Sequence, residues 1–432
     1  MKLIRTYGRS AKEAERLLRQ IEGRSGTATA RLEPTVKRIL TAVRQKGDVA
    51  LRHYAERLDG LAPNALLRVS REEMSSAWEN TPTDLRKAME TAAKNIRRFA
   101  QAQMPKTWAR KLGGVQLGQR CLPVESVGCY VPGGRYPLPS TLLMTTLPAQ
   151  IAGVSRIVVV SPRPAQETLA AAYLAGVQEF YRIGGAQAIS ALAYGTASIP
   201  RVDKIVGPGN LYVTAAKKLV AFDCSIDMLA GPTEILVASE NGNPQWIAAD
   251  LVAQAEHDLE ALAILVTSNQ ELASATAEEV QRQFVTNTVA KQSLRTGGFI
   301  FLTKNNQETQ SISNRLASEH VTIDSEKDLD WLRHAGSIFI GTQTPQSMGD
   351  YISGPNHVLP TGRLARTRGG LSVLDFLRIV TTQAYTSSGL ARLGPHASRL
   401  AEAEGLVGHA ASVRIRINNA KTQRATKRGA SR

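Results

Sequence analysis

Apolar residues in the first quarter of the chain recur at every third or fourth position, which is the spacing of amphipathic helices. Residues 9–110 show this spacing in several stretches, among them AKEAERLLRQIEG and TVKRILTAVRQKGDVALRHYAERLDG. After Gly118 the pattern changes, and short apolar runs alternate with helical stretches. The β-branched run RIVVVSP, residues 156–162, is typical of a parallel strand buried on both faces. We therefore expect a helical N-terminal region followed by a long α/β region.

The alternation after Gly118 falls into two consecutive sets. Strands of the first set are expected at VGCYVPGG, RIVVVSP, EFYRIGG and DKIVGPG, and strands of the second at EILVASE, ALAILVTSN, GFIFLT and SIFIG. Helical stretches such as PSTLLMTTLPAQIAGV and PQWIAADLVAQAEHD separate them. This alternation indicates an α/β fold with two doubly wound sheets and a cleft between them. From about Asp375 we expect helix again, ending in the short strand SVRIRI.

Length and composition set broad limits on the class of protein. A chain of 432 residues is too long for one compact core, so we expect more than one domain. It has no long uninterrupted apolar run and no apolar core near its start, which argues against a membrane span or a signal peptide. The cysteines, Cys121, Cys129 and Cys224, are too scattered for a disulfide framework or a thiolate metal site. We expect a cytoplasmic protein.

The net charge of +16 raises the question of nucleic-acid binding. Residues 414–432 carry seven of the positive charges and no acidic residue, a composition typical of a frayed, solvated tail. The chain has neither a zinc-finger spacing nor a basic stripe interleaved with aromatic residues. We therefore expect no nucleic-acid partner and no membrane partner.

Three glycine-rich motifs, VPGG, IGGAQ and VGPGN, each lie at the end of an expected strand and the beginning of an expected helix. Backbone N–H groups at such helix starts face an anion readily. None of the three is a G-x-G-x-x-G fingerprint or a phosphate-binding loop with its lysine, so each alone is most simply a turn. Because they follow one another along the same expected sheet, they favour a nucleotide or dinucleotide cleft.

Four short polar motifs contain most of the side chains that could bind a metal or transfer a proton, and these motifs lie far apart in the chain. They are AQAEHD, ASEH, GDYISGPNHVLP and AEGLVGH. Ligands of a catalytic metal converge from separate elements of a fold, so this dispersal favours a metal-dependent enzyme. Gln254 and His257 are spaced to share one face of a predicted helix, where both can bind one ion. His53, His334 and His396 have no such polar context, and we expect no site role for them.

These motifs and their order closely resemble those of the histidinol dehydrogenase family. The similarity is carried by VGCYVPGG, RIGGAQAISALAYGT, VDKIVGPGNLYVTAAKKL, IDMLAGPTEILV, QAEHD, SEH, GDYISGPNHVLPT, GGLSVLDF and AEGLVGH. It covers nearly the whole chain as far as His409, and so many long motifs in a fixed order make it specific. The resemblance implies an NAD-dependent alcohol and aldehyde dehydrogenase. Such an enzyme oxidises L-histidinol through L-histidinaldehyde to L-histidine with two NAD⁺, the last two steps of histidine biosynthesis.

The resemblance also implies roles for individual residues. One Zn²⁺ per subunit would be held by Gln254, His257, Asp350 and His409. The substrate would contact these four ligands and also Thr233, His320 and Glu404. NAD would contact Tyr130, Gln187 and Asn210. His320 would act as general base for both hydride transfers, and Glu319 would activate the water that hydrates the aldehyde. An imidazole that titrates near neutrality suits a base that is used twice.

The same resemblance implies a homodimer and a division into domains. The C-terminal segment would complete the partner's site, so Glu404 and His409 would act in trans. The fold class expected on this basis comprises two doubly wound Rossmann-like domains, a helical N-terminal region and a small C-terminal dimerisation segment. The expected divisions are 1–127 (helical region), 128–235 (NAD-binding), 236–374 (zinc and substrate) and 375–432 (dimer contact with the basic tail).

A few features depart from the family pattern. Ser318 stands where the family usually has Pro, and the stretch after RIVVVSP is shorter than usual. Cys129, beside Tyr130, raises the alternative of a thiohemiacetal mechanism, but a small apolar strand residue is the simpler interpretation.

Two other functions are also weighed against histidinol oxidation. A related zinc- and NAD-dependent dehydrogenase of another small alcohol, such as sulfopropanediol, would keep the Glu-His pair but would have less need of Glu404. A non-enzymatic binding protein with two α/β lobes would need neither the Glu-His pair nor four convergent ligands.

Overall fold

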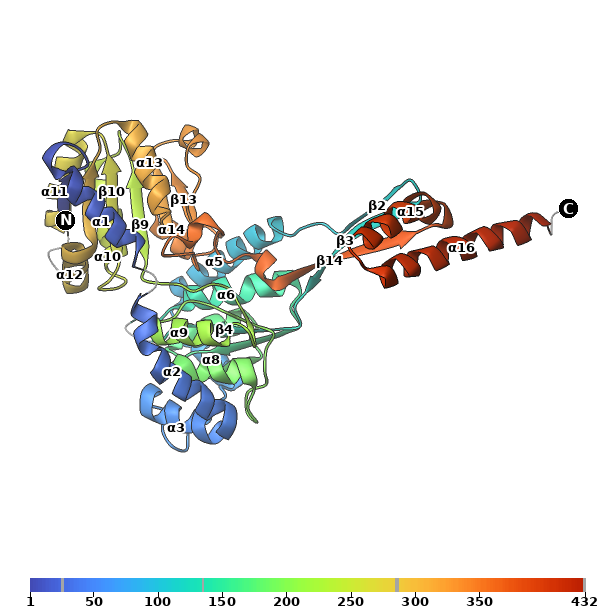
Figure 1. The fold of residues 1–432 in the computed structure, drawn as a ribbon. Coiled ribbons are helices and arrows are strands. Elements are labelled where there is room, and N and C mark those ends of the chain that lie inside the picture. The colour runs from blue at the N-terminus through green and yellow to red at the C-terminus, as the bar shows by residue number, and fades with distance from the viewer. Residues whose placement is uncertain (25–26, 134–135, 284–286, 430–432) are drawn as a thin grey trace. The chain divides into compact units, whose positions relative to one another are not determined.

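The computed structural model describes residues 1–24, 27–133, 136–283 and 287–429 of the chain. The chain divides into two compact units, each built from two stretches of sequence. Unit 1 consists of Met1–Gln103 and Val124–Phe376, and unit 2 consists of Met104–Pro123 and Leu377–Arg432. Both parallel sheets belong to unit 1 (Figure 1). Among the described residues, no helix is long and apolar enough to cross a membrane.

Helices dominate the N-terminal part of unit 1, as the spacing of apolar residues predicts. Val36 and Val43 of α2 and Leu51 of α3 are fully buried in a core that also contains residues of the first sheet. The local pattern does not predict β1 (Lys2–Arg5), which pairs in parallel with a strand almost three hundred residues later. The helices are α1 (Ala11–Glu22), α2 (Thr27–Lys46), α3 (Asp48–Asp59), α4 (Arg71–Glu79) and α5 (Thr83–Ala102), after the short 3-10 helix η1 (Gly8–Ser10).

The first parallel sheet contains five strands in the order β6-β5-β4-β7-β8. They are β4 (Ser126–Tyr130), β5 (Arg156–Val160), β6 (Glu179–Tyr181), β7 (Lys204–Val206) and β8 (Ser225–Ile226). The connecting helices are α6 (Pro139–Ala152), α7 (Gln166–Leu174), α8 (Gly185–Tyr194) and α9 (Leu211–Val220). Figure 1 shows α2, α8 and α9 near β4, and these elements share one buried core. In chain order the strands run third, second, first, fourth, fifth, so the winding direction reverses between β4 and β7.

The second parallel sheet repeats this winding. Its order is β1-β11-β10-β9-β12-β13, so the reversal falls between β9 and β12. The strands are β9 (Glu234–Ala238), β10 (Leu262–Thr267), β11 (Gly298–Leu302), β12 (His320–Ile323) and β13 (Ser337–Ile340). The helices are α10 (Pro244–Ala255), α11 (Gln270–Gln283), α12 (Thr288–Gly297), α13 (Asn306–Leu316) and α14 (Ser347–Tyr351), with the 3-10 helices η2 (Glu326–Asp330), η3 (Leu364–Arg366) and η4 (Val373–Phe376). The predicted α/β fold with two doubly wound sheets is confirmed.

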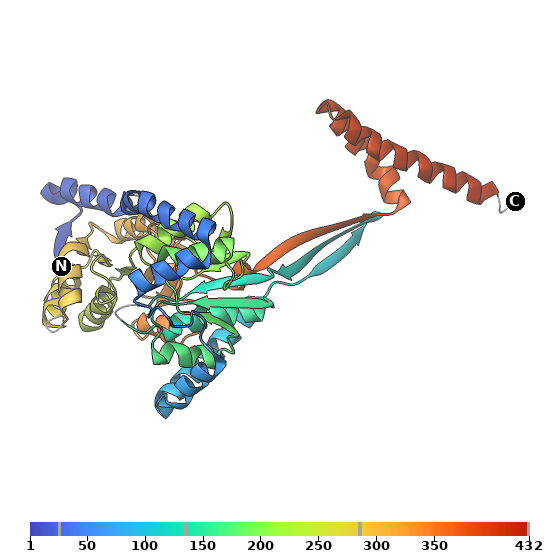
Figure 2. The same cartoon turned by 90° about the horizontal axis from the view of Figure 1, so that it is seen from below.

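Unit 2 is an antiparallel sheet of order β14-β3-β2 with two helices. Figure 2 shows β3 and β14 side by side, as their register from Leu377 opposite Pro123 to Tyr385 opposite Val115 requires. The elements are β2 (Trp108–Leu112), β3 (Val115–Pro123), β14 (Leu377–Tyr385), α15 (Ser387–Ala403) and α16 (Val407–Gly429).

Three predictions for the C-terminal segment are wrong. The segment after Asp375 continues into the strand β14 rather than directly into helix, because β14 finds its partner in β3. SVRIRI is not a strand but part of α16, and so is most of the basic tail that we expected to be frayed. Val413 and Ile417, four residues apart, lie against Gly394 of α15, so their spacing serves a helix–helix contact. Side chains beyond Asn418 lie outside the described residues.

Candidate active site

A cavity of about 170 Å³ in unit 1 is lined by many of the residues that the sequence singled out. Its lining comes from the first turn of α6, the glycine turn after β7, the residues before β9 and β12, the end of α10, and α14. The lining residues are Leu138, Ser140, Thr141, Pro208, Thr233, Gln254, His257, Glu319, His320, Asp350, Tyr351 and His357. The cavity thus joins the carboxyl edge of the first sheet to the amino ends of two strands of the second.

The parallel register of β9 and β12 places the Glu-His pair. His320 lies opposite Ile235 in that register, which brings the loop before β12 beside the loop before β9. The Glu319 carboxylate accepts hydrogen bonds from the Thr233 hydroxyl and, at 2.9 Å, from the backbone N–H of Glu234. His320 Nδ1 lies 3.2 Å from the carbonyl oxygen of Glu234 and 3.6 Å from Glu319 Oε2. Both side chains are therefore fixed by one neighbouring strand.

The electrostatics of His320 differ from the prediction. Its side chain is buried, and its Nε2 lies 3.5 Å from Asp350 Oδ1. Burial by itself lowers the pKa of this imidazole, but the carboxylates of Glu319 and Asp350 outweigh burial and raise the pKa to about 10. Burial likewise opposes ionisation of Asp350, yet His320 holds the pKa of that carboxyl below its ordinary value. Without a cation at Asp350, His320 therefore carries a proton at neutral pH instead of titrating near neutrality.

Three of the four expected zinc ligands line this cavity. They are Gln254, His257 and Asp350, which offer an amide oxygen, an imidazole nitrogen and a carboxylate oxygen. Gln254 is buried; its amide N–H donates to the Thr233 hydroxyl, and its Oε1 accepts from Gln346 Nε2 at 3.2 Å. This mixed set suits a catalytic zinc that keeps positions open for substrate. Within the described part of the chain, no three His, Cys, Asp or Glu side chains form a metal-binding group on their own.

The remaining expected ligand and substrate contact belong to unit 2. His409 lies in the first turn of α16 and Glu404 caps the end of α15, and both side chains are exposed. They do not line the cavity of unit 1. One local prediction also needs correction. Because α10 ends at Ala255, Gln254 and His257 do not share a helix face; His257 follows in a turn in which its N–H donates to the Gln254 carbonyl.

The three expected NAD contacts lie at the carboxyl ends of strands in the first sheet. Tyr130 ends β4, and its hydroxyl accepts a hydrogen bond of 3.1 Å from the N–H of Gly185. Gln187, in the first turn of α8, is fully buried, and its Oε1 has no hydrogen-bond partner among the described residues. Asn210 caps α9 by accepting from the N–H groups of Tyr212 and Val213. Pro208, in the same turn as Asn210, lines the cavity, so this edge of the sheet adjoins the acid–base residues.

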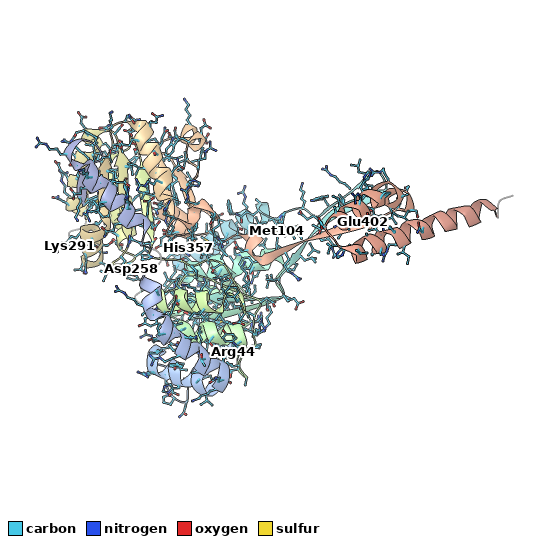
Figure 3. The ribbon with its side chains drawn as sticks, in the orientation of Figure 1. Arg44, Met104, Asp258, Lys291, His357 and Glu402 are labelled. Carbon is cyan, nitrogen blue, oxygen red and sulfur yellow. The ribbon has the colours of Figure 1, made fainter. Side chains whose placement is uncertain are left out.

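Two residues around the site were given no role from the sequence. His357, labelled in Figure 3, bridges the Asp350 carbonyl at 2.8 Å and the Thr141 hydroxyl at 3.1 Å. Asp59, at the end of α3, accepts from the N–H of Gly184 and from Gln187 Nε2, and burial raises its pKa. For His357 the Gly-Pro-Asn-His turn after Asp350 is a usable signal in the sequence. For Asp59 no local signal exists, because its partners lie more than a hundred residues away.

Cys129 is excluded as a nucleophile. It is fully buried in β4, the central strand of the first sheet, and burial raises the pKa of its thiol to about 12. Because the thiolate is the reactive form, this residue contributes packing and not covalent chemistry.

Two doubly wound sheets and an acid–base cavity beside a glycine-rich edge define an α/β enzyme of the dehydrogenase class. The histidinol dehydrogenase family model matches residues 22–417. The histidinol dehydrogenase of Aquifex aeolicus is 45% identical over 396 residues, which cover 90% of this chain and 93% of that protein. The histidinol dehydrogenase of Synechococcus is 43% identical over 430 residues, with 96% and 99% covered. A crystal structure of histidinol dehydrogenase from Elizabethkingia anophelis superposes with a TM-score of 0.90 at 33% identity, covering 97% of this chain and 98% of that one.

The chain belongs to the histidinol dehydrogenase family, and the predicted class of enzyme, an oxidoreductase, is confirmed. The non-enzymatic alternative and the paralogous dehydrogenase are not favoured by these similarities.

Proposed function

We propose that the protein oxidises L-histidinol through L-histidinaldehyde to L-histidine, with two NAD⁺ as hydride acceptors, in the cytoplasm. The observation that carries this proposal is the composition of one cavity. The lining of this cavity includes the buried Glu319–His320 pair, the potential metal ligands Gln254, His257 and Asp350, and Pro208 of the glycine turn after β7. A proton acceptor, a substrate anchor and a hydride acceptor are what the reaction requires in one place.

A zinc ion fits the donor set of this cavity. Gln254, His257 and Asp350 would hold it, together with His409 from a second subunit. When bound, the ion would anchor the imidazole and amine of the substrate, and its charge would offset that of Asp350. The pull of Asp350 on the His320 proton would then weaken, which brings the pKa of His320 back toward the range of a general base.

Within this arrangement His320 takes the alcohol proton as hydride leaves to the nicotinamide. Its buried Nε2 lies 3.5 Å from Asp350 Oδ1 and has no hydrogen-bond partner among the described residues, so once Asp350 binds the metal this nitrogen would be available to accept a hydrogen bond from substrate. Glu319 then removes a proton from the water that adds to the aldehyde, and His320 returns the proton it holds to the carbonyl oxygen, which completes the hydrate and frees His320 to act as base again. The hydrate loses a second hydride while His320 again accepts the hydroxyl proton. Thr233 links Glu319 to a proposed zinc ligand, because its hydroxyl donates a hydrogen bond to Glu319 and accepts one from the Gln254 amide.

We propose further that the protein is a homodimer in which unit 2 packs against a second copy of the chain. The strands of unit 2 leave large apolar side chains exposed, including Trp108 at 45%, Leu112 at 83% and Ile379 at 54%. Apolar exposure of this extent on a small sheet indicates a surface covered in an assembly. Glu404 and His409 are exposed on the helices of the same unit and would enter the partner's cavity.

Metal removal tests the proposed ligand set. Chelation should abolish histidinol-dependent NADH formation, and zinc should restore it, because the substrate would lose its anchor and His320 would stay protonated. Metal content is measured alongside activity. Undiminished turnover in a sample verified to be metal-free would contradict the proposal.

A further inference from the structure

The glycine turn of residues 207–210, here called the cofactor turn, is held by a buried ion pair that the reaction itself does not use. Lys217 Nζ pairs with Asp227 Oδ1, and the two side chains are only 3% and 0% exposed. Lys217 belongs to α9, and Asp227 follows β8. Neither residue lines the cavity. The pair therefore contacts no reacting group.

Both partners bind the backbone of a single glycine. The N–H of Gly207 donates to Asp227 Oδ2 at 2.8 Å, and Lys217 Nζ donates to the Gly207 carbonyl at 2.9 Å. The backbone N–H of Met228 also donates to Asp227, which fixes the carboxylate from the other side. The ion pair thus binds both the N–H and the carbonyl group of Gly207, the first residue of the cofactor turn. This pair is here called the clamp.

The position of Gly207 links two of the three predicted NAD contacts, Tyr130 and Asn210. Its φ of +111° is one that a side chain rarely tolerates, and a Cβ there would lie 2.1 Å from the Tyr130 carbonyl oxygen. Gly207 therefore rests directly on Tyr130. Asn210, at the other end of the turn, fixes the start of α9 through its side chain. A shift of Gly207 would move the turn, and Asn210 with it, relative to Tyr130.

Stability alone does not account for such a pair. A buried ion pair is often no more stabilising than apolar residues of similar size, because two charges must be desolvated. Apolar side chains would, however, leave the N–H and the carbonyl of Gly207 without partners. What the pair supplies beyond packing is the fixed orientation of this one residue.

We propose that Lys217 and Asp227 are positioning residues that determine the affinity for the dinucleotide by fixing the cofactor turn. This inference rests on the proposed function, in which Tyr130 and Asn210 contact NAD. Loss of the clamp then weakens dinucleotide binding and raises the KM for NAD⁺. The KM for histidinol, measured at saturating NAD⁺, stays unchanged, because the proposed histidinol-binding residues lie at the ends of β9, β12 and α10, on α14 and in unit 2, and not on the cofactor turn.

The test is a fluorescence titration of the full-length dimer with NADH, together with both KM values. The variants are Lys217→Met and the double change Lys217→Met with Asp227→Leu, which leaves no lone buried charge. Lys218→Met is the matched control: Lys218 is the next residue of α9, but it is 49% exposed and pairs with Glu33 on the surface. Circular dichroism and the thermal midpoint establish which variants fold.

The folded double variant should bind NADH about tenfold more weakly or worse, since it loses two hydrogen bonds that fix the turn. Lys218→Met should bind like the unaltered protein. Wild-type affinity for NADH in the folded double variant would overturn the inference, and so would an equal rise in both KM values. Absence of NADH binding in the unaltered protein would instead overturn the proposed function on which the inference rests.

Discussion

At the scale of single residues, Glu319 and His320 are adjacent in the chain but their side chains have different surroundings. Glu319 accepts hydrogen bonds from the Thr233 hydroxyl and the Glu234 N–H, so its carboxylate is held in one orientation. His320 lies between Glu319 and Asp350, and these two carboxylates raise its pKa to about 10 despite burial. The basicity of His320 therefore depends on what Asp350 binds, whereas Glu319 is fixed by the protein alone. This difference predicts that the two residues fail at different steps.

Glu319→Gln should separate the two oxidations. Glutamine keeps an oxygen that accepts from Thr233 and Glu234 but cannot act as a base, so hydration of the aldehyde should slow by about 10²–10⁴-fold. Oxidation of histidinol to the aldehyde should survive, visible in rapid mixing as a burst of about one NADH per site. His320→Ala, as the comparison, should suppress the burst as well. Equal damage to both steps by Glu319→Gln would refute this division.

At the scale of elements, the sequence predicts most of unit 1 because its strands are short apolar runs between helices. It also predicts which strand ends carry the site, since the glycine-rich motifs and the polar motifs flank the apolar strand segments. It does not predict β1 or β14, whose partner strands lie hundreds of residues away in the chain. Nearly every residue of β14 is exposed, so no alternation of buried and polar positions marks it. The sequence does not predict the roles of Asp59 and Gln346 either, because tertiary contacts determine them.

Gln346, just before α14, connects two elements of the proposed metal site. Its side chain is buried and donates to Gln254 Oε1, while its backbone N–H bonds to Asp250 of α10. Gln346→Ala should remove only the first contact and lower zinc affinity by about 10–100-fold, measured by competition with a chelator. Gln343→Ala, at an exposed position of the same segment, is the control and should bind zinc normally. Unchanged zinc affinity in Gln346→Ala would show that Gln254 is oriented without it.

At the scale of the whole molecule, the proposed site needs residues from both units. The cavity of unit 1 contains three proposed zinc ligands, and unit 2 carries Glu404 and His409 on its exposed helices. If the second copy supplies these two residues, an intact site requires two chains. The apolar strands of unit 2 are then covered in the dimer, which accounts for their composition.

Mixed dimers test this arrangement. His320→Ala and His409→Ala should each be inactive alone. When the two variants are dissociated and reassembled together, about half of the dimers are mixed, and each mixed dimer has one intact site, so about a quarter of the wild-type activity should return. Native mass spectrometry verifies that mixing has occurred. No recovery in verified mixed dimers would mean that each site is built within one chain.

The central claim is that one cavity carries out both oxidations of histidinol, and the ratio of NADH formed to histidinol consumed tests it most directly. The account predicts a ratio of two, with L-histidine as the product, because Glu319 hydrates the aldehyde before it leaves and His320 serves as base a second time. A ratio of one with free aldehyde in solution, or no NADH formation with histidinol in the zinc-loaded protein, would contradict it.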